Sequence, residues 1–178
     1  MTELKRRPLP HDFHPPVPSF TVTSADVEEG ATLGSAQVQA EGDTSPQLRW
    51  EGFPPETKSF AVTCYDPDAP PAAGSGTGPV RHPASVTELP AGAGGGKFEG
   101  CPRAPCTRGT TTGRRTSAVP RRRPGDGPHR YVFTVYAVDQ EKLGPDSDAS
   151  PAVVGFNLRF HAIARAQLVG EYENPAKG

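Results

Sequence analysis

Cysteine is scarce in this chain of 178 residues, and its placement argues against two kinds of small scaffold. The three cysteines are Cys64, inside an apolar run, and Cys101 and Cys106, in an arginine-rich stretch. An odd number, no C-x-x-C spacing and no histidine at metal-ligand spacing disfavour a disulfide framework and a zinc site. We therefore expect no metal and no cofactor. Free thiols fit a reducing compartment, so we expect a cytoplasmic protein.

Long apolar runs and the signatures of common enzymes are also absent. No apolar run reaches the roughly 18 residues that a membrane span needs, and the N-terminus MTELKRRPLPHDFHPPVP has no apolar core of signal-peptide length. We expect no membrane span. The sequence contains no G-x-S-x-G, P-loop, G-x-G-x-x-G or H-E-x-x-H motif, which removes the most familiar enzyme classes.

Acidic residues are missing from one stretch, residues 101–124, which reads CPRAPCTRGTTTGRRTSAVPRRRP. Its seven arginines are half of those in the chain, and without them the formal net charge falls from −1 to −8. The rest of the protein is therefore acidic. Because the stretch lacks interleaved aromatic residues and helical periodicity, we expect no nucleic-acid partner.

Glycine and proline are abundant instead, with 20 and 22 residues, which is typical of a loop-rich β protein. The length suits one domain. We expect an irregular, proline-rich arm over residues 1–18 and a single domain over residues 19–178. Period-two patterns and β-forming residues predict strands within SFTVT (19–23), SAQVQA (35–40), SPQLRW (45–50), KSFAVTCY (58–65) and RYVFTVYAV (130–138).

One helix is signalled late in the chain. Ser150 suits an N-cap and Pro151 suits the first helical position. The expected apolar face consists of Val153, Phe156, Phe160, Ile163 and Ala164, with Gly170 beyond the helix end and a short strand in LVGEYEN. Strands separated by turns, followed by one helix, predict a mainly β protein, an antiparallel β-sandwich with a C-terminal helix rather than a parallel sheet.

Two polar clusters could carry chemistry. In YDPDAP, Asp66 and Asp68 follow a strand and point the same way if the segment is extended, so they could orient donors, hold a cation or share a proton. An Asx-Pro turn that caps the strand explains the same pattern. In GDGPHRYVF, His129, Arg130 and Tyr131 could together bind an oxyanion, although residues at a strand entry are often structural.

The remaining histidines lack a comparable context. His11, His14 and His82 lie among prolines, so we expect them on the surface. His161 falls on the expected helix, where a surface or packing position explains it.

An ordered set of segments resembles a known family. SPQLRW (45–50), GFPPETKSFAV (52–62), DPDAP (66–70), PASVTELPAGA (83–93), GPHRYVFTVYAVD (127–139) and HAIARAQLVGEY (161–172) resemble the phosphatidylethanolamine-binding, Raf-kinase-inhibitor-like proteins, and most closely their bacterial branch. The resemblance implies a β-sandwich with a C-terminal helix beside a small anion pocket for phosphate-like or carboxylate-like head groups. It implies a non-catalytic binding or inhibitory module, with a protease or kinase as a partner, and a homodimer.

By this resemblance, Asp66, Asp68, Ala69 and Pro70 form one pocket wall, and His129 and Tyr131 form another. Two family elements are missing. The family's His-Trp pair is absent from PAAGSGTGPVRHPA (71–84). The family's Asn-Asp-Tyr-Gly element, with its Gly-Gly and Pro-Pro loop, is replaced by residues 101–124.

Translation out of frame explains both gaps. If residues 101–124 are read one nucleotide out of frame, the ACx codons of Thr110, Thr111 and Thr112 become xAC, which can encode Asn, Asp and Tyr, and Gly113 can again encode Gly. Residues 75–78 can likewise encode Phe-Trp-His-Trp. We hypothesise that both stretches are frameshifted; a genuine basic insertion is the alternative.

The anomalous stretches, 71–82 and 101–124, bury little apolar surface as written. We therefore expect partial disorder at about 71–82 and 100–126 and impaired ligand binding. A rival interpretation is a hydrolase that uses an Asp–His pair for acid–base work, although no nucleophile is evident.

Overall fold

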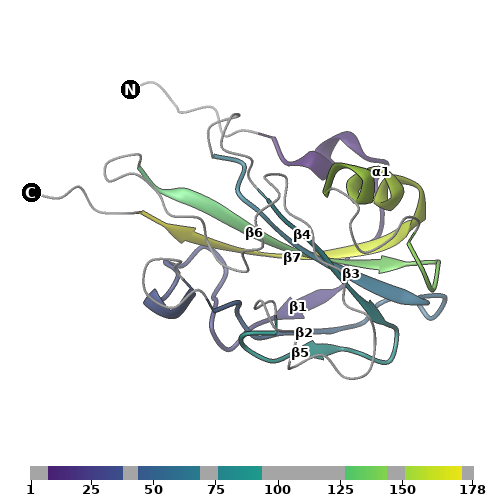
Figure 1. The fold of residues 1–178 in the computed structure, drawn as a ribbon, viewed down its shortest axis with the longest axis horizontal. Coiled ribbons are helices and arrows are strands. Elements are labelled where there is room, and N and C mark those ends of the chain that lie inside the picture. Colours follow the sequence, from purple (N-terminus) through teal and green to yellow (C-terminus); the bar gives the residue numbers. More distant parts are fainter. Residues whose placement is uncertain (1–7, 38–43, 69–75, 94–126, 144–150, 174–178) are drawn as a thin grey trace, which may run out of the picture.

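The computed structural model describes residues 8–37, 44–68, 76–93, 127–143 and 151–173, and these residues form two antiparallel sheets and one α-helix (Figure 1). In chain order the elements are η1 (Pro10–Phe13), β1 (Thr21–Thr23), η2 (Ser35–Gln37), β2 (Leu48–Glu51), β3 (Ser59–Tyr65), β4 (Gly76–Pro83), β5 (Glu88–Leu89), β6 (His129–Val138), α1 (Pro151–His161) and β7 (Ala162–Tyr172). The smaller sheet has the order β1-β2-β5 and the larger sheet β4-β3-β6-β7. The predicted antiparallel sandwich with a C-terminal helix is confirmed.

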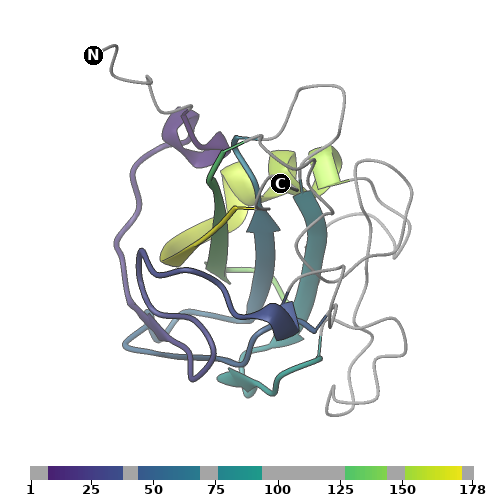
Figure 2. The ribbon, with the colours of Figure 1, turned by 90° about the vertical axis from the view of Figure 1, so that its left-hand side faces the viewer.

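The core lies between the two sheets, which face each other in Figure 2. Trp50 of the smaller sheet packs edge-on against Phe60 of the larger sheet, with ring centroids 5.3 Å apart. In the larger sheet, Phe60 is opposite Ala137 and Val62 is opposite Val135, so these side chains share the inner face. The strong β-formers that predict β3 and β6 therefore form the centre of the sandwich.

Strand β4 occupies most of a stretch for which the sequence predicts partial disorder. Residues 76–83 pair with β3 at the edge of the larger sheet, so the expectation for 71–82 is wrong over this part. The pairing runs from Val62 opposite Val80 to Cys64 opposite Thr77, which leaves one extra residue in β4. An edge strand with a bulge tolerates proline, as at Pro79, because the N–H that proline lacks is not needed for the strand ladder at such a position. Residues 71–75 and 100–126 lie outside the described residues.

Helix α1 begins at Pro151, as predicted, but it buries a different face. Val154 and Leu158 pack against the outer face of the larger sheet, beside Tyr136 and Val138. Three residues of the predicted apolar face, Val153, Phe156 and Phe160, are instead 41%, 65% and 63% exposed. Val154 and Leu158 are four residues apart, so they lie on the same face of the helix, and this face packs on the sheet.

The predicted helix is also too long. It ends at His161, and Ile163 and Ala164 belong to β7, which pairs with β6 along its whole length. Burial alternates in β7, with Ala164, Ala166, Leu168 and Gly170 on the buried side. This alternation, which is typical of a strand, is already visible in the sequence, but the helical interpretation did not take it into account.

Other predicted strands are confirmed within the bounds given above, with one exception. Ser35–Gln37, in the weakly alternating SAQVQA, forms the 3-10 helix η2, and residues 38–43 lie outside the described residues. Among the helices of the described residues, none is long and apolar enough to cross a membrane.

Candidate functional site

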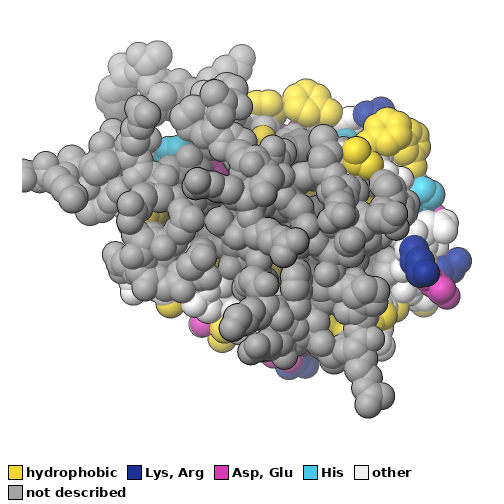
Figure 3. Space-filling view, viewed as in Figure 1, with side chains coloured by type: hydrophobic (Ala, Val, Ile, Leu, Met, Phe, Trp, Pro, Cys, Tyr) yellow, Lys and Arg dark blue, Asp and Glu magenta, His cyan; other side chains and the backbone are white. Residues whose placement is uncertain are grey.

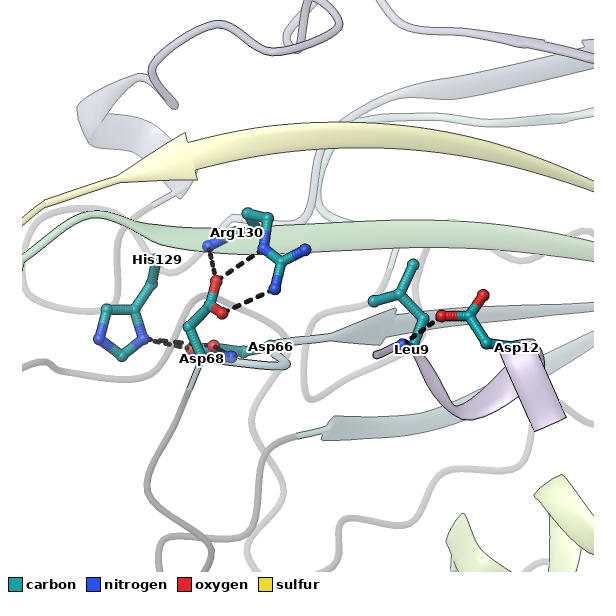
Figure 4. A network of polar contacts seen from close by, with 6 residues as sticks. All are labelled: Leu9, Asp12, Asp66, Asp68, His129 and Arg130. Carbon is teal, nitrogen blue, oxygen red and sulfur yellow. Dashed lines mark hydrogen bonds and ion pairs between the residues drawn. The ribbon is translucent and has the colours of Figure 1, made fainter. Parts of the chain in front are cut away.

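The two polar clusters meet because β3 and β6 are antiparallel neighbours. Tyr65, the last residue of β3, is opposite Val132, so the turn after β3 lies beside the first residues of β6. Asp66 and Asp68 thereby contact His129 and Arg130 (Figure 4). Residues far apart in the sequence thus form one polar cluster at the end of the larger sheet.

Asp66 and His129 form a buried pair. Nδ1 of His129 lies 3.2 Å from both carboxylate oxygens of Asp66, and the side chains are only 4% and 2% exposed. Because a carboxylate accepts, Nδ1 carries the proton and donates to Asp66. The pair fixes the orientation and the tautomer of the imidazole.

Asp66 also organises its own turn. Its Oδ1 accepts a hydrogen bond of 2.9 Å from the backbone N–H of Asp68. This is the Asx turn that the sequence offered as the simple interpretation of DPDAP. The turn and the buried pair are therefore compatible, since one carboxylate serves both.

Asp68 and Arg130 form a second, two-pronged pair. Nε and Nη2 of Arg130 donate to the Asp68 carboxylate over 2.8 and 2.7 Å, and the Arg130 backbone N–H donates to it over 3.0 Å. Such fork geometry suits a guanidinium and a carboxylate. The family resemblance does not include Arg130 in the expected pocket walls, although its position between His129 and Tyr131 was the available signal.

The electrostatics of this second pair follow from its contacts. Burial opposes ionisation of Asp68, but hydrogen bonds from Arg130, the charge of Arg130 and the charge of His129 together lower the pKa of Asp68. The hydrogen bond to Asp68 raises the pKa of Arg130 despite burial, and the charges of Asp68, Glu171 and Asp12 raise it further. Both groups are thus held in their charged forms.

The other expected site residues fall differently. Tyr131 is fully buried and belongs to the core cluster between the sheets, with Gly170 opposite it on β7. Ala69 and Pro70 lie outside the described residues.

Two of the remaining histidines, His11 and His82, are buried, and a third, His161, pairs with an acid as His129 does. His11 and His82 are buried, with exposures of 5% and 2%, and not on the surface as expected. His161 pairs with Asp139 over 3.1 Å, but its side chain is 35% exposed. This pair lies beyond the far end of β6, so it repeats the chemistry of Asp66 and His129 away from the polar cluster.

Within the part of the chain that the structure describes, no group of three or more His, Cys, Asp or Glu residues could hold a metal ion.

Comparison with known proteins agrees with the fold. A family model for phosphatidylethanolamine-binding protein matches residues 23–173. The chain belongs to this family. The UPF0098 protein YbcL of Escherichia coli is 39% identical over 168 residues, which cover 87% of this chain and 88% of YbcL. YbhB of the same organism is 41% identical over 136 residues, covering 74% of this chain and 84% of YbhB.

Solved structures give the same result. The crystal structure of E. coli YbcL, described as a new member of the mammalian family, superposes with a TM-score of 0.80, covering 87% of this chain and 98% of that one. A family homologue from Chlamydia trachomatis, CT736, superposes with a TM-score of 0.70 at 25% identity, covering 87% and 97%. The predicted resemblance to the bacterial branch of the family is confirmed.

Proposed function

We propose that the protein is a non-catalytic binding module that accepts a small anion, a phosphate-like or carboxylate-like head group, beside His129. The observation that carries this proposal is the buried pair of Asp66 and His129, in which both carboxylate oxygens lie 3.2 Å from Nδ1. Membership of the phosphatidylethanolamine-binding protein family supports a binding role.

The pair prepares an imidazole to meet an anion. Asp66 occupies Nδ1, so a protonated ring would donate its second N–H, at Nε2, to a ligand oxygen. The Asp66 carboxylate stabilises that imidazolium, as a buried acid does for a paired histidine. Asp68 keeps Arg130 aligned at the next residue of β6, and the turn that Asp66 holds would lie beside the ligand.

Three further residues enter the proposal through the family resemblance. Ala69 and Pro70 would continue the wall that begins at Asp68. Tyr131 would contribute its phenol to the opposite wall or, given its burial in the core, hold the strand that carries His129.

Binding of inorganic phosphate, acetate and phosphoethanolamine, measured by calorimetry or NMR, tests the proposal. We expect His129→Gln to weaken binding by about tenfold or more, since one charge-assisted hydrogen bond contributes about 1.5–3 kcal/mol. His161→Gln is the matched control, because His161 has the same Nδ1 contact with Asp139 at a distant place. Equal affinity in the wild type and in His129→Gln would contradict the proposal, as would an equal loss in the control.

The same pair favours one alternative, a hydrolase in which Asp66 and His129 act as an acid–base couple. Turnover of phosphate and carboxylate esters distinguishes the two functions. Turnover that is lost in Asp66→Asn and kept in Asp139→Asn would support the hydrolase. No turnover together with anion binding would support the binding module.

We further propose that binding is impaired in this chain. The His-Trp and Asn-Asp-Tyr-Gly elements of the family, which would complete the pocket, are replaced within residues 71–82 and 101–124. The frameshift hypothesis explains both replacements.

The partners follow as proposals from the same resemblance. A protease or kinase would dock at the pocket rim, so its capture should depend on His129.

A second copy of the chain would cover the exposed face of α1. There the rings of Phe156 and Phe160 pack edge to face, with centroids 5.1 Å apart, beside other exposed hydrophobic side chains (Figure 3). Light scattering at several concentrations tests the homodimer: Phe156→Ser should favour the monomer. The compartment we propose is the cytoplasm.

A further inference from the structure

The N-terminal arm is attached to the larger sheet by one buried side chain. The strap, defined here as residues 9–18, runs along the flank of the molecule in Figure 2. Among the strap residues whose burial the structure describes, His11 is the one buried side chain, at 5% exposure. The strap therefore depends on the packing of a titratable group.

His11 docks on the outer face of β7 and β6. Nε2 of Gln167, on β7, lies 3.0 Å from Nε2 and 3.3 Å from Nδ1 of the imidazole, and it also donates to the hydroxyl of Thr134, on β6. The amide N–H of Gln167 needs an acceptor, which a neutral imidazole provides at one ring nitrogen. A protonated imidazole has only donors, so it would face another donor across a contact of 3.0 Å.

Arginines hold the strap backbone at three points. Arg165 of β7 donates from Nη1 to the carbonyl of His11 over 3.4 Å and from its backbone N–H to the carbonyl of Pro18 over 3.0 Å. Arg159 of α1 donates to the carbonyl of Phe13 over 3.3 Å. The charge of Arg165 would also repel a protonated His11.

Arg165 lies on an edge strand. Strand β7 is the last strand of the larger sheet, and Ser19 forms a bridge with Arg165 at the end of the strap. Farther along, residues 30, 31 and 33 cover β7 through hydrogen bonds with Val169 and Glu171. Loops that cover an edge strand prevent its pairing with another chain. The strap thus covers the part of β7 around Arg165, which residues 30–33 do not reach.

We propose that the strap is a pH-sensitive cover of β7: a neutral His11 keeps it docked, and protonation of His11 releases it and uncovers the edge around Arg165.

The charges around His11 give the direction. Burial lowers the pKa of His11 from 6.5, the charge of Arg165 lowers it further, Asp12 raises it and His14 lowers it. A released strap therefore binds a proton more tightly than a docked one, so docking is lost as the pH falls below 6.5.

Of the other titratable groups around the strap, Asp12 opposes release, since its Oδ1 lies 3.7 Å from Nε2 of His11, and the rest act in the same sense as burial or stay neutral. His14, on the strap itself, has its pKa lowered by burial and by Arg159 and Arg165. Tyr136 of β6, next to Arg165, has its pKa raised by burial and stays neutral. Asp12 is the one acid that favours a charged His11 among the groups that act on it.

Hydrogen exchange of the Arg165 amide measures docking directly, because that amide donates to Pro18. After correction for intrinsic exchange, we expect its protection to fall by about tenfold or more between pH 7.5 and pH 5 in the full chain. His11→Gln, which cannot titrate, should lose most of this pH dependence, and the part that remains should come from His14. His14→Gln, the matched control, should keep most of it. Unchanged protection in the wild type, or a pH dependence as large in His11→Gln as in the wild type, would overturn the proposal.

A second measurement, made on the wild type alone, tests the proposal even if the strap of His11→Gln does not dock at any pH. The titration of the His11 ring in the wild type, followed by NMR, should have a midpoint below 6.5, because docking disfavours protonation of the ring. A midpoint at or above 6.5 would overturn the proposal even if His11→Gln had lost the strap altogether.

Discussion

Nδ1 of His129 lies 3.2 Å from both carboxylate oxygens of Asp66, although 63 residues separate them in the chain. The contact exists because β3 ends where β6 begins in an antiparallel pair. The adjacent residues repeat the relationship, since Asp68 binds Arg130 from the same turn. One strand pairing thus brings two acids to two bases.

The pair of Asp68 and Arg130 should stabilise the fold. Arg130→Gln would leave a carboxylate that is 24% exposed without its two-pronged partner, so we expect a loss of about 1–3 kcal/mol in the free energy of unfolding, measured in urea. Arg49→Gln, at an exposed position on β2, should change it by less than about 0.5 kcal/mol. Similar effects in both variants would show that the pair contributes nothing specific.

The same pair should give an acid-sensitive contribution. Because the pKa of Asp68 is lowered below 3.8 in the folded protein, its stabilisation is present above pH 3.8 and is lost as the pH falls through the folded value. Urea titrations between about pH 2 and pH 5 should therefore show a smaller pH dependence in Asp68→Asn than in the wild type.

His82 should act over a higher pH range. Burial lowers its pKa to about 4 from 6.5, so the unfolded chain binds its proton first as the pH falls. The free energy of unfolding should decrease from pH 6.5 down to about pH 4, by on the order of 3 kcal/mol for this group. In His82→Leu, which cannot titrate, this part of the pH dependence should vanish; an unchanged slope would mean that His82 titrates normally in the fold.

Two glycines provide a matched test of packing. A Cβ on Gly170 would overlap the side chain of Leu33 and approach Cγ1 of Val27 to 3.2 Å, so Gly170→Ala should destabilise the fold by about 1–3 kcal/mol. A Cβ on Gly155, within α1, meets no atom within 4 Å. Gly155→Ala should therefore stabilise the protein by about 0.5–1 kcal/mol through helix propensity. Thermal unfolding of both variants measures this contrast, and a stable Gly170→Ala would argue against the packing of Leu33 beneath β7.

Restoring the reading frame should restore binding. A variant in which residues 75–78 read Phe-Trp-His-Trp and residues 101–124 contain Asn-Asp-Tyr-Gly should bind phosphoethanolamine about tenfold more tightly or better than the present chain. Sequencing of the source DNA across codons 70–125 tests the frameshift itself. Equal affinity of the two proteins would contradict the proposed impairment, whichever sequence the DNA contains.

The strength of each sequence pattern explains which elements were predictable. The runs in β3 and β6 are so rich in β-formers that their identity does not depend on neighbours. The region from Pro151 to Tyr172 is ambiguous, because Ile163 and Ala164 fit a helical face as well as the alternation that continues through Ala166 and Leu168. Pairing with β6 resolves the ambiguity in favour of a strand from Ala162. Only packing could also show that Val154 and Leu158, and not Phe156 and Phe160, face the sheet.

The sequence by itself determined the family, the antiparallel sandwich and the candidate residues Asp66, Asp68 and His129, because motifs and strand periodicity are local properties. The tertiary structure alone decided that Arg130 pairs with Asp68, that Tyr131 is buried in the core and that His11 anchors the strap on β7. These relationships depend on strand register and on contacts between distant segments. No local pattern encodes them, since pairing across a sheet brings together residues whose separation along the chain says nothing of their distance in space.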